Sequence, residues 1–180
     1  MRLDGADKAS VEYLGRTLLE HALDALLDAS EVVVVGDPVP TTQPVTFTRE
    51  DPRYGGPVAA LLTGLDALEH PPTTVGVLAV DMPRVTPWTL RRLEEAAAGH
   101  DGAFLTDATG RRQLAGVLDA ARLEEVRPDH EGQHGMPLHR LLATLDLVDI
   151  GPDGDEGRDV DTWADLRDLS GPEDQQGVAD

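Results

Sequence analysis

Val75-Gly-Val-Leu-Ala-Val-Asp-Met-Pro83 lies near the middle of the chain, and in it an apolar run ends abruptly in one acidic side chain followed by a methionine and a proline. This pattern predicts a buried strand with Asp81 at its carboxyl end. Ligands bind at this edge of open α/β sheets, where a carboxylate can hold a divalent cation against a phosphate group. The alternative is that Asp81 only caps the helix expected to begin near Thr86 or solvates a turn.

The segments on either side of this strand alternate between strand and helix patterns. Residues 31–36 are apolar and β-branched on both faces, as expected for a parallel strand covered by helices. The expected strands are 31–36, 45–48, 75–80, 103–106, 114–118 and 147–150, and the expected helices are 14–29, 56–69, 86–98, 136–145 and 162–169. This alternation predicts an α/β fold with a mostly parallel sheet in three layers. Residues 1–169 are expected to form one domain and the polar residues 170–180 a disordered tail.

The composition limits the partners that the chain can have. Its formal net charge of -19 argues against nucleic-acid and anionic-membrane surfaces but leaves room for a small, metal-chelated anion. Without cysteine there is no disulfide framework, thiolate chemistry or cysteine zinc site. No apolar run approaches the roughly 18 residues of a membrane span, and no targeting segment is visible, so the cytoplasm is the expected location.

Two further features suggest anion binding. Lys8 is the only lysine among 15 lysines and arginines, and a compact ammonium suits a phosphate oxygen where a planar guanidinium fits poorly. Gly55-Gly-Pro57 precedes an Ala- and Leu-rich helix, where paired glycines let backbone N–H groups approach a phosphate or carboxylate. A tight turn stopped by proline is the alternative for this segment. The six histidines, three of them at His130, His134 and His139, have no HExxH arrangement and are interpreted as scattered surface residues.

Taken in order, these features resemble the molybdenum cofactor guanylyltransferases, which are nucleotidyltransferases with a Rossmann-like fold. The matching segments are Arg2-Leu-Asp-Gly-Ala-Asp-Lys8-Ala, Gly15-Arg-Thr-Leu-Leu, Val-Val-Val-Val-Gly36, Arg49-Glu-Asp-Pro, Gly55-Gly-Pro-Val-Ala-Ala-Leu, Val80-Asp-Met-Pro and Asp159-Val-Asp-Thr-Trp-Ala-Asp-Leu. They run from Arg2 to about Leu169, nearly the whole chain.

The resemblance implies a role for each matching position. Lys8 would contact the nucleotide phosphates, and Arg2 would stabilise charge near them while the α-phosphate is attacked. Asp81 matches the magnesium-binding aspartate, and Asp161 matches a segment that returns a side chain toward the metal, with a helix N-cap as its alternative. The nucleotide-binding positions are Lys8, Asp51, Gly55, Gly56, Pro57 and Asp81, and the positions facing the second substrate are Arg111, Arg112, Gln113 and Arg140. Simple solvation is the alternative for the arginines.

Met1 falls inside the family signature, so the first strand and the Leu-Ala-Gly-Gly part of the phosphate loop are expected to be missing. In doubly wound sheets this strand is usually central, and its loss would leave two neighbours without ladder partners. A start placed too far downstream, a shortened chain and a decayed, inactive paralogue all fit this expectation.

The expected function is Mg²⁺-dependent transfer of GMP from GTP to a molybdopterin-type cofactor, with release of pyrophosphate. A molybdoenzyme or its chaperone would be the protein partner, and neither nucleic acid nor membrane is expected as one. Two alternatives stay open. One is a related transferase that uses CTP or another phosphorylated acceptor, and the other is a non-catalytic remnant that binds a nucleotide or a partner.

Overall fold

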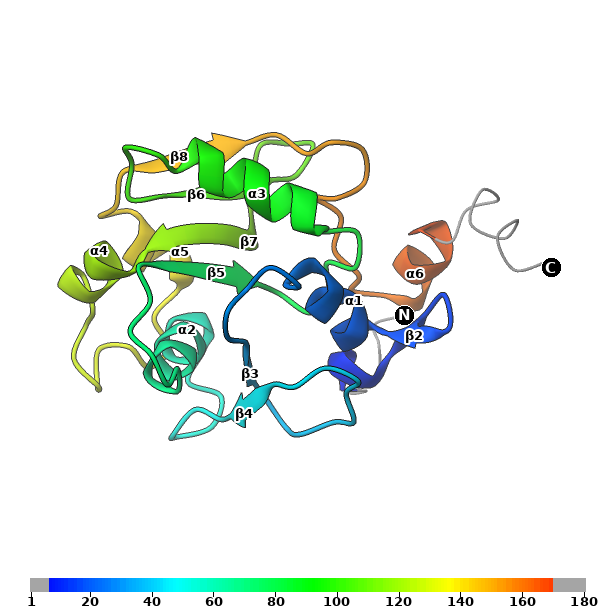
Figure 1. Ribbon diagram of the computed structural model, residues 1–180, viewed down its shortest axis with the longest axis horizontal. Coiled ribbons are helices and arrows are strands. Elements are labelled where there is room, and N and C mark those ends of the chain that lie inside the picture. The colour runs from blue at the N-terminus through cyan, green and yellow to red at the C-terminus, as the bar shows by residue number, and fades with distance from the viewer. Residues whose placement is uncertain (1–6, 170–180) are drawn as a thin grey trace.

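A computed structural model describes residues 7–169 and has a four-stranded sheet at its centre (Figure 1). The strands lie in the order β5 (Thr74–Leu78), β7 (Arg112–Asp119), β6 (Gly102–Thr106) and β8 (Leu147–Ile150). β7 is antiparallel to β5 and β6, and β6 is parallel to β8. Three of the four strands therefore share one direction, and the expected mostly parallel sheet is confirmed with β7 reversed.

The remaining strands form two small sheets of their own. β3 (Val33–Val35) pairs in parallel with β4 (Thr46–Thr48), and β1 (Glu12–Tyr13) forms an antiparallel hairpin with β2 (Arg16–Thr17). Within residues 7–169, no strand joins the β3–β4 pair to β5 by hydrogen bonds, and Figure 1 shows the pair on the side of β5 opposite β7. β3 and β5 thus each have one hydrogen-bonded neighbour.

Helices cover both faces of the central sheet. One hydrophobic core joins α3 (Pro87–Ala96) and the end of α1 (Leu18–Ala25) to Ala103 and Leu105 of β6. A second core lies on the other face, where Phe104 packs with α2 (Pro57–Asp66), α4 (Ala120–Glu125) and α5 (Leu138–Leu142). Successive residues of β6 point to opposite faces, as strand geometry requires. The expected three-layer α/β architecture is confirmed.

Several boundaries differ from those expected. α1 begins at Leu18 instead of residue 14, because Thr17 and Glu20 form a capping box directly after the β1–β2 hairpin. The hairpin and the six-residue α4 were not predicted, since elements this short carry no periodic pattern. α6 (Trp163–Leu169) is close to its expected position. Arg2 and the expected tail 170–180 lie outside the described residues, among which no helix is long and apolar enough to cross a membrane.

Candidate active site

Three of the residues singled out from the sequence meet in the structure. The Lys8 ammonium donates hydrogen bonds to Asp81 Oδ2 at 2.6 Å and to Asp161 Oδ1 at 2.7 Å. These carboxylates are 73 and 153 residues from Lys8 along the chain. The three side chains are 32%, 21% and 65% exposed, so the cluster lies at the surface and is accessible to a ligand.

A small hydrophobic core brings the three segments together. It contains the buried Val11 and Val160, and the half-buried Val80 packs against it. Each of these valines lies within three residues of a member of the cluster. A backbone hydrogen bond reinforces this packing, in which the Val160 N–H donates to the Asp81 carbonyl at 2.8 Å. The position of the two carboxylates is therefore fixed by buried apolar neighbours and backbone pairing, and does not depend on Lys8 alone.

Lys8 opens the 3₁₀ turn η1 (Lys8–Ser10), which Asp7 caps by accepting a hydrogen bond from the Ala9 N–H at 3.1 Å. Partial burial lowers the pKa of Lys8. The hydrogen bonds to Asp161 and Asp81, together with their charges, outweigh this effect and raise the pKa above its ordinary value. Lys8 is consequently a cation at neutral pH.

The structure excludes the capping role that the sequence left open for each aspartate. Thr86, not Asp81, caps α3 by accepting from the Thr89 N–H. At α6, Thr162 and Asp165 satisfy one another's backbone N–H groups, and the Asp161 side chain turns toward Lys8 instead. Hydrogen bonding to the Thr162 hydroxyl lowers the pKa of Asp165, which is consistent with a charged cap.

Glu156 holds the connection between β8 and α6 against α3, and the sequence analysis did not identify it. Its carboxylate accepts from the Thr89 hydroxyl at 2.6 Å, the Arg92 guanidinium at 2.6 Å and the Asp153 N–H at 2.7 Å, and the residue is 6% exposed. No local signal could have found it, because Glu156 stands in an acidic loop whose composition is typical of solvated residues. It lies five residues before Asp161 and so helps to position that side chain.

Replacing Glu156 by alanine is expected to lower the free energy of unfolding by about 3 kcal/mol, because Arg92 and Thr89 would lose a buried partner. Urea denaturation followed by circular dichroism measures the change. Asp155→Ala is the matched control, since the Asp155 side chain forms an exposed pair with Arg158 at 3.7 Å. Its cost should stay within about 0.5 kcal/mol. Equal costs for both variants would contradict the proposed positioning role.

The turn formed by Gly55, Gly56 and Pro57, called the glycine turn below, lies close to the backbone of Gly135. Gly56 is the N-cap of α2 with φ 90°, and it offers no side-chain cap to the first N–H groups of the helix. A Cβ on Gly55 would lie 2.7 Å from the Cβ of Ala59, so only glycine fits there. The Gly55 carbonyl accepts from the Gly135 N–H at 2.7 Å, which joins the turn to the loop before α5. Pro57 occupies the first position of the helix, where proline is favoured.

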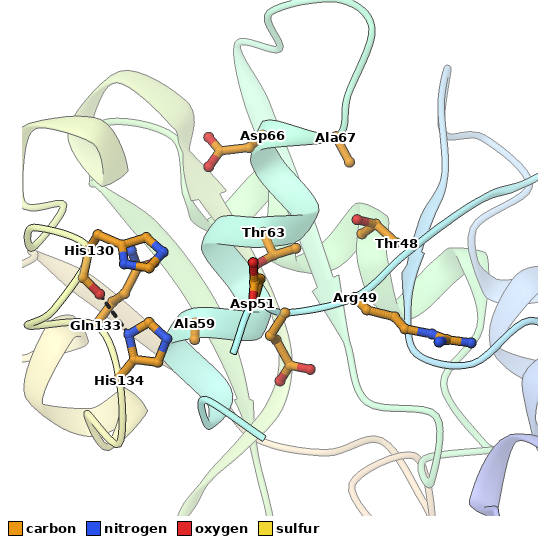
Figure 2. A pocket seen from close by; sticks show the side chains of 11 residues that line it. Thr48, Arg49, Asp51, Ala59, Thr63, Asp66, Ala67, His130, Gln133 and His134 are labelled. Atoms are coloured by element: carbon orange, nitrogen blue, oxygen red, sulfur yellow. Dashed lines mark hydrogen bonds between the residues drawn. The ribbon is translucent and has the colours of Figure 1, made fainter. Parts of the chain in front are cut away.

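A pocket of about 360 Å³ lies beside this turn (Figure 2). Its walls come from Thr48 at the end of β4 with residues 49–51, from α2 with Ala67 directly after it, and from residues 130–134. Asp51 lines it, as do Glu50, Thr63 and the two histidines of the 130–134 segment. His130 and His134, interpreted from the sequence as scattered surface residues, thus share one wall, and the sequence analysis missed this pocket.

The expected second-substrate residues are not all brought together. Arg112 and Gln113 begin β7 at the sheet edge where β5 ends, because the Ala79 N–H donates to the Leu114 carbonyl at 2.7 Å. Arg112 pairs with Asp149 at 2.6 Å and Gln113 with Asp107 at 3.1 Å, while Arg111 is exposed. Arg140 is exposed on α5, and no hydrogen bond or ion pair in residues 7–169 links it to the other three.

The Lys8 cluster suits a divalent cation with oxygen ligands. Asp81 and Asp161 each place a carboxylate oxygen against the same ammonium nitrogen, so a cation in that position would have both as ligands. The described residues contain no group of three or more carboxylate, histidine or cysteine side chains with metal-binding geometry. Mg²⁺ commonly takes one or two protein carboxylates and completes its shell with phosphate oxygens and water. The donor set therefore fits a metal that arrives with a phosphorylated ligand.

Comparison with known proteins identifies the family. The sequence family described as the MobA-like NTP transferase domain matches residues 1–148, which include Lys8, the glycine turn and Asp81. The chain belongs to this family. Membership makes it a nucleotidyltransferase-type domain, and Asp161 lies beyond the matched residues. Among curated proteins, none matches the chain significantly.

Solved structures agree with the MobA-like assignment at the level of the fold. Molybdopterin-guanine dinucleotide biosynthesis protein A from Archaeoglobus fulgidus is 20% identical and has a TM-score of 0.66, over 92% of this chain and 89% of that one. The 2-C-methyl-D-erythritol 4-phosphate cytidylyltransferase from Thermus thermophilus is 21% identical with a TM-score of 0.69, over 91% of each chain. Rv0371C from Mycobacterium tuberculosis, solved as a complex with manganese, is 20% identical with a TM-score of 0.67, over 92% of each chain. The first two differ in the nucleotide that their names indicate, so these neighbours share the fold and leave substrate choice open.

Proposed function

We propose that this MobA-like protein transfers GMP from GTP to a molybdopterin-type cofactor and releases pyrophosphate. The observation that carries the proposal is the convergence of Lys8, Asp81 and Asp161 at one exposed position. One ammonium and two carboxylates provide the charges that a metal-bound triphosphate needs.

In the proposed reaction, an oxygen of the acceptor's terminal phosphate forms a bond to the α-phosphorus of the nucleotide. The bond from the α-phosphorus to the oxygen that bridges it to the β-phosphate breaks, and pyrophosphate leaves with that electron pair. A phosphate nucleophile is already ionised at neutral pH, so no general base is required. Catalysis then depends on positioning and on stabilising negative charge.

Each residue of the candidate site is proposed to have its own role in this reaction. Asp81 and Asp161 would hold Mg²⁺ or Mn²⁺, which neutralises phosphate charge and polarises the phosphoryl group when bound. Lys8 would leave the two carboxylates and donate to phosphate oxygens, as its compact ammonium allows. Arg2, outside the described residues, is proposed to stabilise charge near the α-phosphate. Asp51 and the turn Gly55, Gly56 and Pro57 would hold the nucleoside end.

The acceptor is proposed to lie against Arg111, Arg112 and Gln113, which stand at the edge of the sheet where β5 ends. Arg140 is the weaker proposal, because no hydrogen bond or ion pair within residues 7–169 links it to the others. A molybdoenzyme or its chaperone would receive the product. A CTP-dependent transferase is the second candidate, since a cytidylyltransferase is among the structural neighbours.

The test is a pyrophosphate-release assay with purified protein, Mg²⁺ or Mn²⁺, a molybdopterin-type phosphate acceptor and either GTP or CTP. We expect one pyrophosphate for each dinucleotide product identified by mass spectrometry, with GTP preferred and all release stopped by EDTA. A product formed from CTP alone would support the cytidylyltransferase alternative instead. Nucleotide binding without any pyrophosphate release would overturn the enzymatic proposal and leave a binding protein.

A further inference from the structure

One backbone carbonyl joins three segments that are far apart along the chain. The Leu169 carbonyl oxygen accepts a hydrogen bond from the Tyr13 hydroxyl at 3.1 Å and another from the Arg84 guanidinium at 2.7 Å. A carbonyl oxygen has two lone pairs, so it can accept both. The guanidinium also lies 5.5 Å from the centroid of the Tyr13 ring, where a cation is attracted to the aromatic face. These three groups, called the Leu169 junction below, therefore contact one another in all three pairs.

Buried surroundings hold the junction in place. Tyr13 and Leu169 are each 2% exposed and belong to the small core described above. Arg84 is half-buried, and its neighbours Met82 and Val85 are buried in the core beneath α3. A buried hydroxyl or carbonyl that loses its partner is not solvated in return, so these hydrogen bonds are costly to break. The junction consequently fixes its three segments more firmly than exposed ion pairs could.

The same three segments carry the Lys8 cluster. Tyr13 is five residues after Lys8, Arg84 is three residues after Asp81, and Leu169 is eight residues after Asp161, at the other end of α6.

The junction gives two of these segments a second point of attachment. The hydrogen bond from the Val160 N–H to the Asp81 carbonyl is the first point, and a single hydrogen bond leaves two segments free to pivot about it. The bond from Arg84 to the Leu169 carbonyl ties the same two segments at a different place. Two points of attachment, together with the packing between them, fix the orientation of the segments as well as their contact.

We propose that Tyr13 and Arg84 are positioning residues of the candidate active site, which hold the Asp161 carboxylate close enough to Asp81 for both to bind one divalent cation. The inference rests on the proposed function, because it assigns these residues to a metal-dependent transfer. Both act through the backbone of the segments that they join. Two carboxylates this close repel each other, and the junction resists that repulsion once Lys8 moves to the phosphates.

The side chain of Lys8 provides a direct test, since it is the only lysine of the chain and ¹⁵N-lysine labelling gives a single ammonium signal. An ammonium held by two carboxylates is restrained and exchanges its protons slowly. In Arg84→Met this signal should move toward that of a solvated lysine. Mn²⁺ binding in the presence of GTP, measured by electron paramagnetic resonance, should weaken about tenfold. Arg84→Lys keeps a cationic donor and should restore most of the Mn²⁺ affinity.

Arg122→Met is the matched control for a loss of stability alone. Arg122 also joins distant segments, because its guanidinium donates to Asp101 at 2.9 Å, and Figure 1 shows its helix α4 at the opposite end of the molecule from α6. This variant should change neither the Lys8 signal nor the Mn²⁺ affinity, whatever its effect on thermal unfolding. Equal changes in Arg122→Met and Arg84→Met would overturn the proposal.

Tyr13→Phe is the second variant, which keeps the ring in the core and removes only the hydroxyl. It should move the Lys8 signal in the same direction and weaken Mn²⁺ binding about threefold. Thermal unfolding checks that each variant is folded. Folded variants of Tyr13 and Arg84 that keep the original Lys8 signal and Mn²⁺ affinity would overturn the positioning role. The Lys8 signal requires neither metal nor nucleotide, so absence of nucleotide transfer would count against the proposed function and not against this inference.

Discussion

Asp81→Asn is expected to lower the rate of metal-dependent nucleotide transfer by at least about 100-fold. Asparagine keeps the size of the side chain and removes its charge, so a cation would retain one charged ligand, Asp161. The backbone around residue 81 should be unaffected, because the Asp81 carbonyl and not its side chain accepts from Val160. Initial rates of pyrophosphate release measure the effect on catalysis.

Direct metal binding separates this explanation from misfolding. Electron paramagnetic resonance of Mn²⁺ in the presence of nucleotide should show weaker binding by Asp81→Asn. Asp28→Asn is the matched control, since Asp28 is an exposed carboxylate whose ion pair is with Arg91 at 2.6 Å. It should leave both rate and metal affinity unchanged. An Asp81→Asn protein that transfers nucleotide at the original rate would exclude Asp81 as a metal ligand.

Lys8→Met is expected to change metal and nucleotide binding in opposite directions. Without nucleotide, the Lys8 ammonium lies between the two carboxylates, at the position that a cation would take. Its removal leaves two negative charges without their counterion, so the affinity for Mn²⁺ alone should rise about tenfold. The affinity for the triphosphate should fall by about the same factor, because one charge-assisted hydrogen bond to phosphate is lost.

Two controls make the Lys8 result specific. Lys8→Arg keeps the charge and should bind Mn²⁺ as weakly as the unmodified protein does. Arg91→Met removes an exposed cation elsewhere and should change neither affinity. If Lys8→Met weakened Mn²⁺ binding, the lysine would be supporting the metal site instead of competing for it, and its proposed movement to the phosphates would be wrong.

Part of this arrangement could be predicted from the sequence because its signals are local. The apolar run before Asp81 predicted a strand, which the structure forms as β5, and a single lysine among arginines indicated Lys8. The expected burial of this strand and its expected end at Val80 were wrong, because β5 ends at Leu78 and, with one hydrogen-bonded neighbour, contains only half-buried and exposed residues. The alternation of strand and helix patterns indicated the three-layer fold. Each of these signals depends on neighbours along the chain, which is the range over which periodicity and turn residues carry information.

The features that could not be predicted from the sequence depend on contacts between segments that are far apart along the chain. The hairpin that carries Tyr13 into the small core has strands of two residues, too short for any alternation to be recognised. Glu156 and His134 owe their environments to α3 and to the glycine turn, respectively, and nothing adjacent to them in the sequence distinguishes them from solvated side chains. The antiparallel direction of β7 could not be predicted either, because the residue pattern of a strand is the same for both directions in the sheet.

The separation of the β3–β4 pair from the central sheet has a consequence for local unfolding. Strands of three largely half-buried residues should open at a lower free energy than fully buried β6, whose neighbours pair with it on both sides. Residues 49–51 follow β4 directly, so each opening event removes one wall of the pocket, while the Asp81 carbonyl keeps its hydrogen bond from the Val160 N–H. A ligand in the pocket would bind only the closed form and would stabilise it by mass action. The part of the protein that recognises a base would thus be the part that the base itself helps to fold.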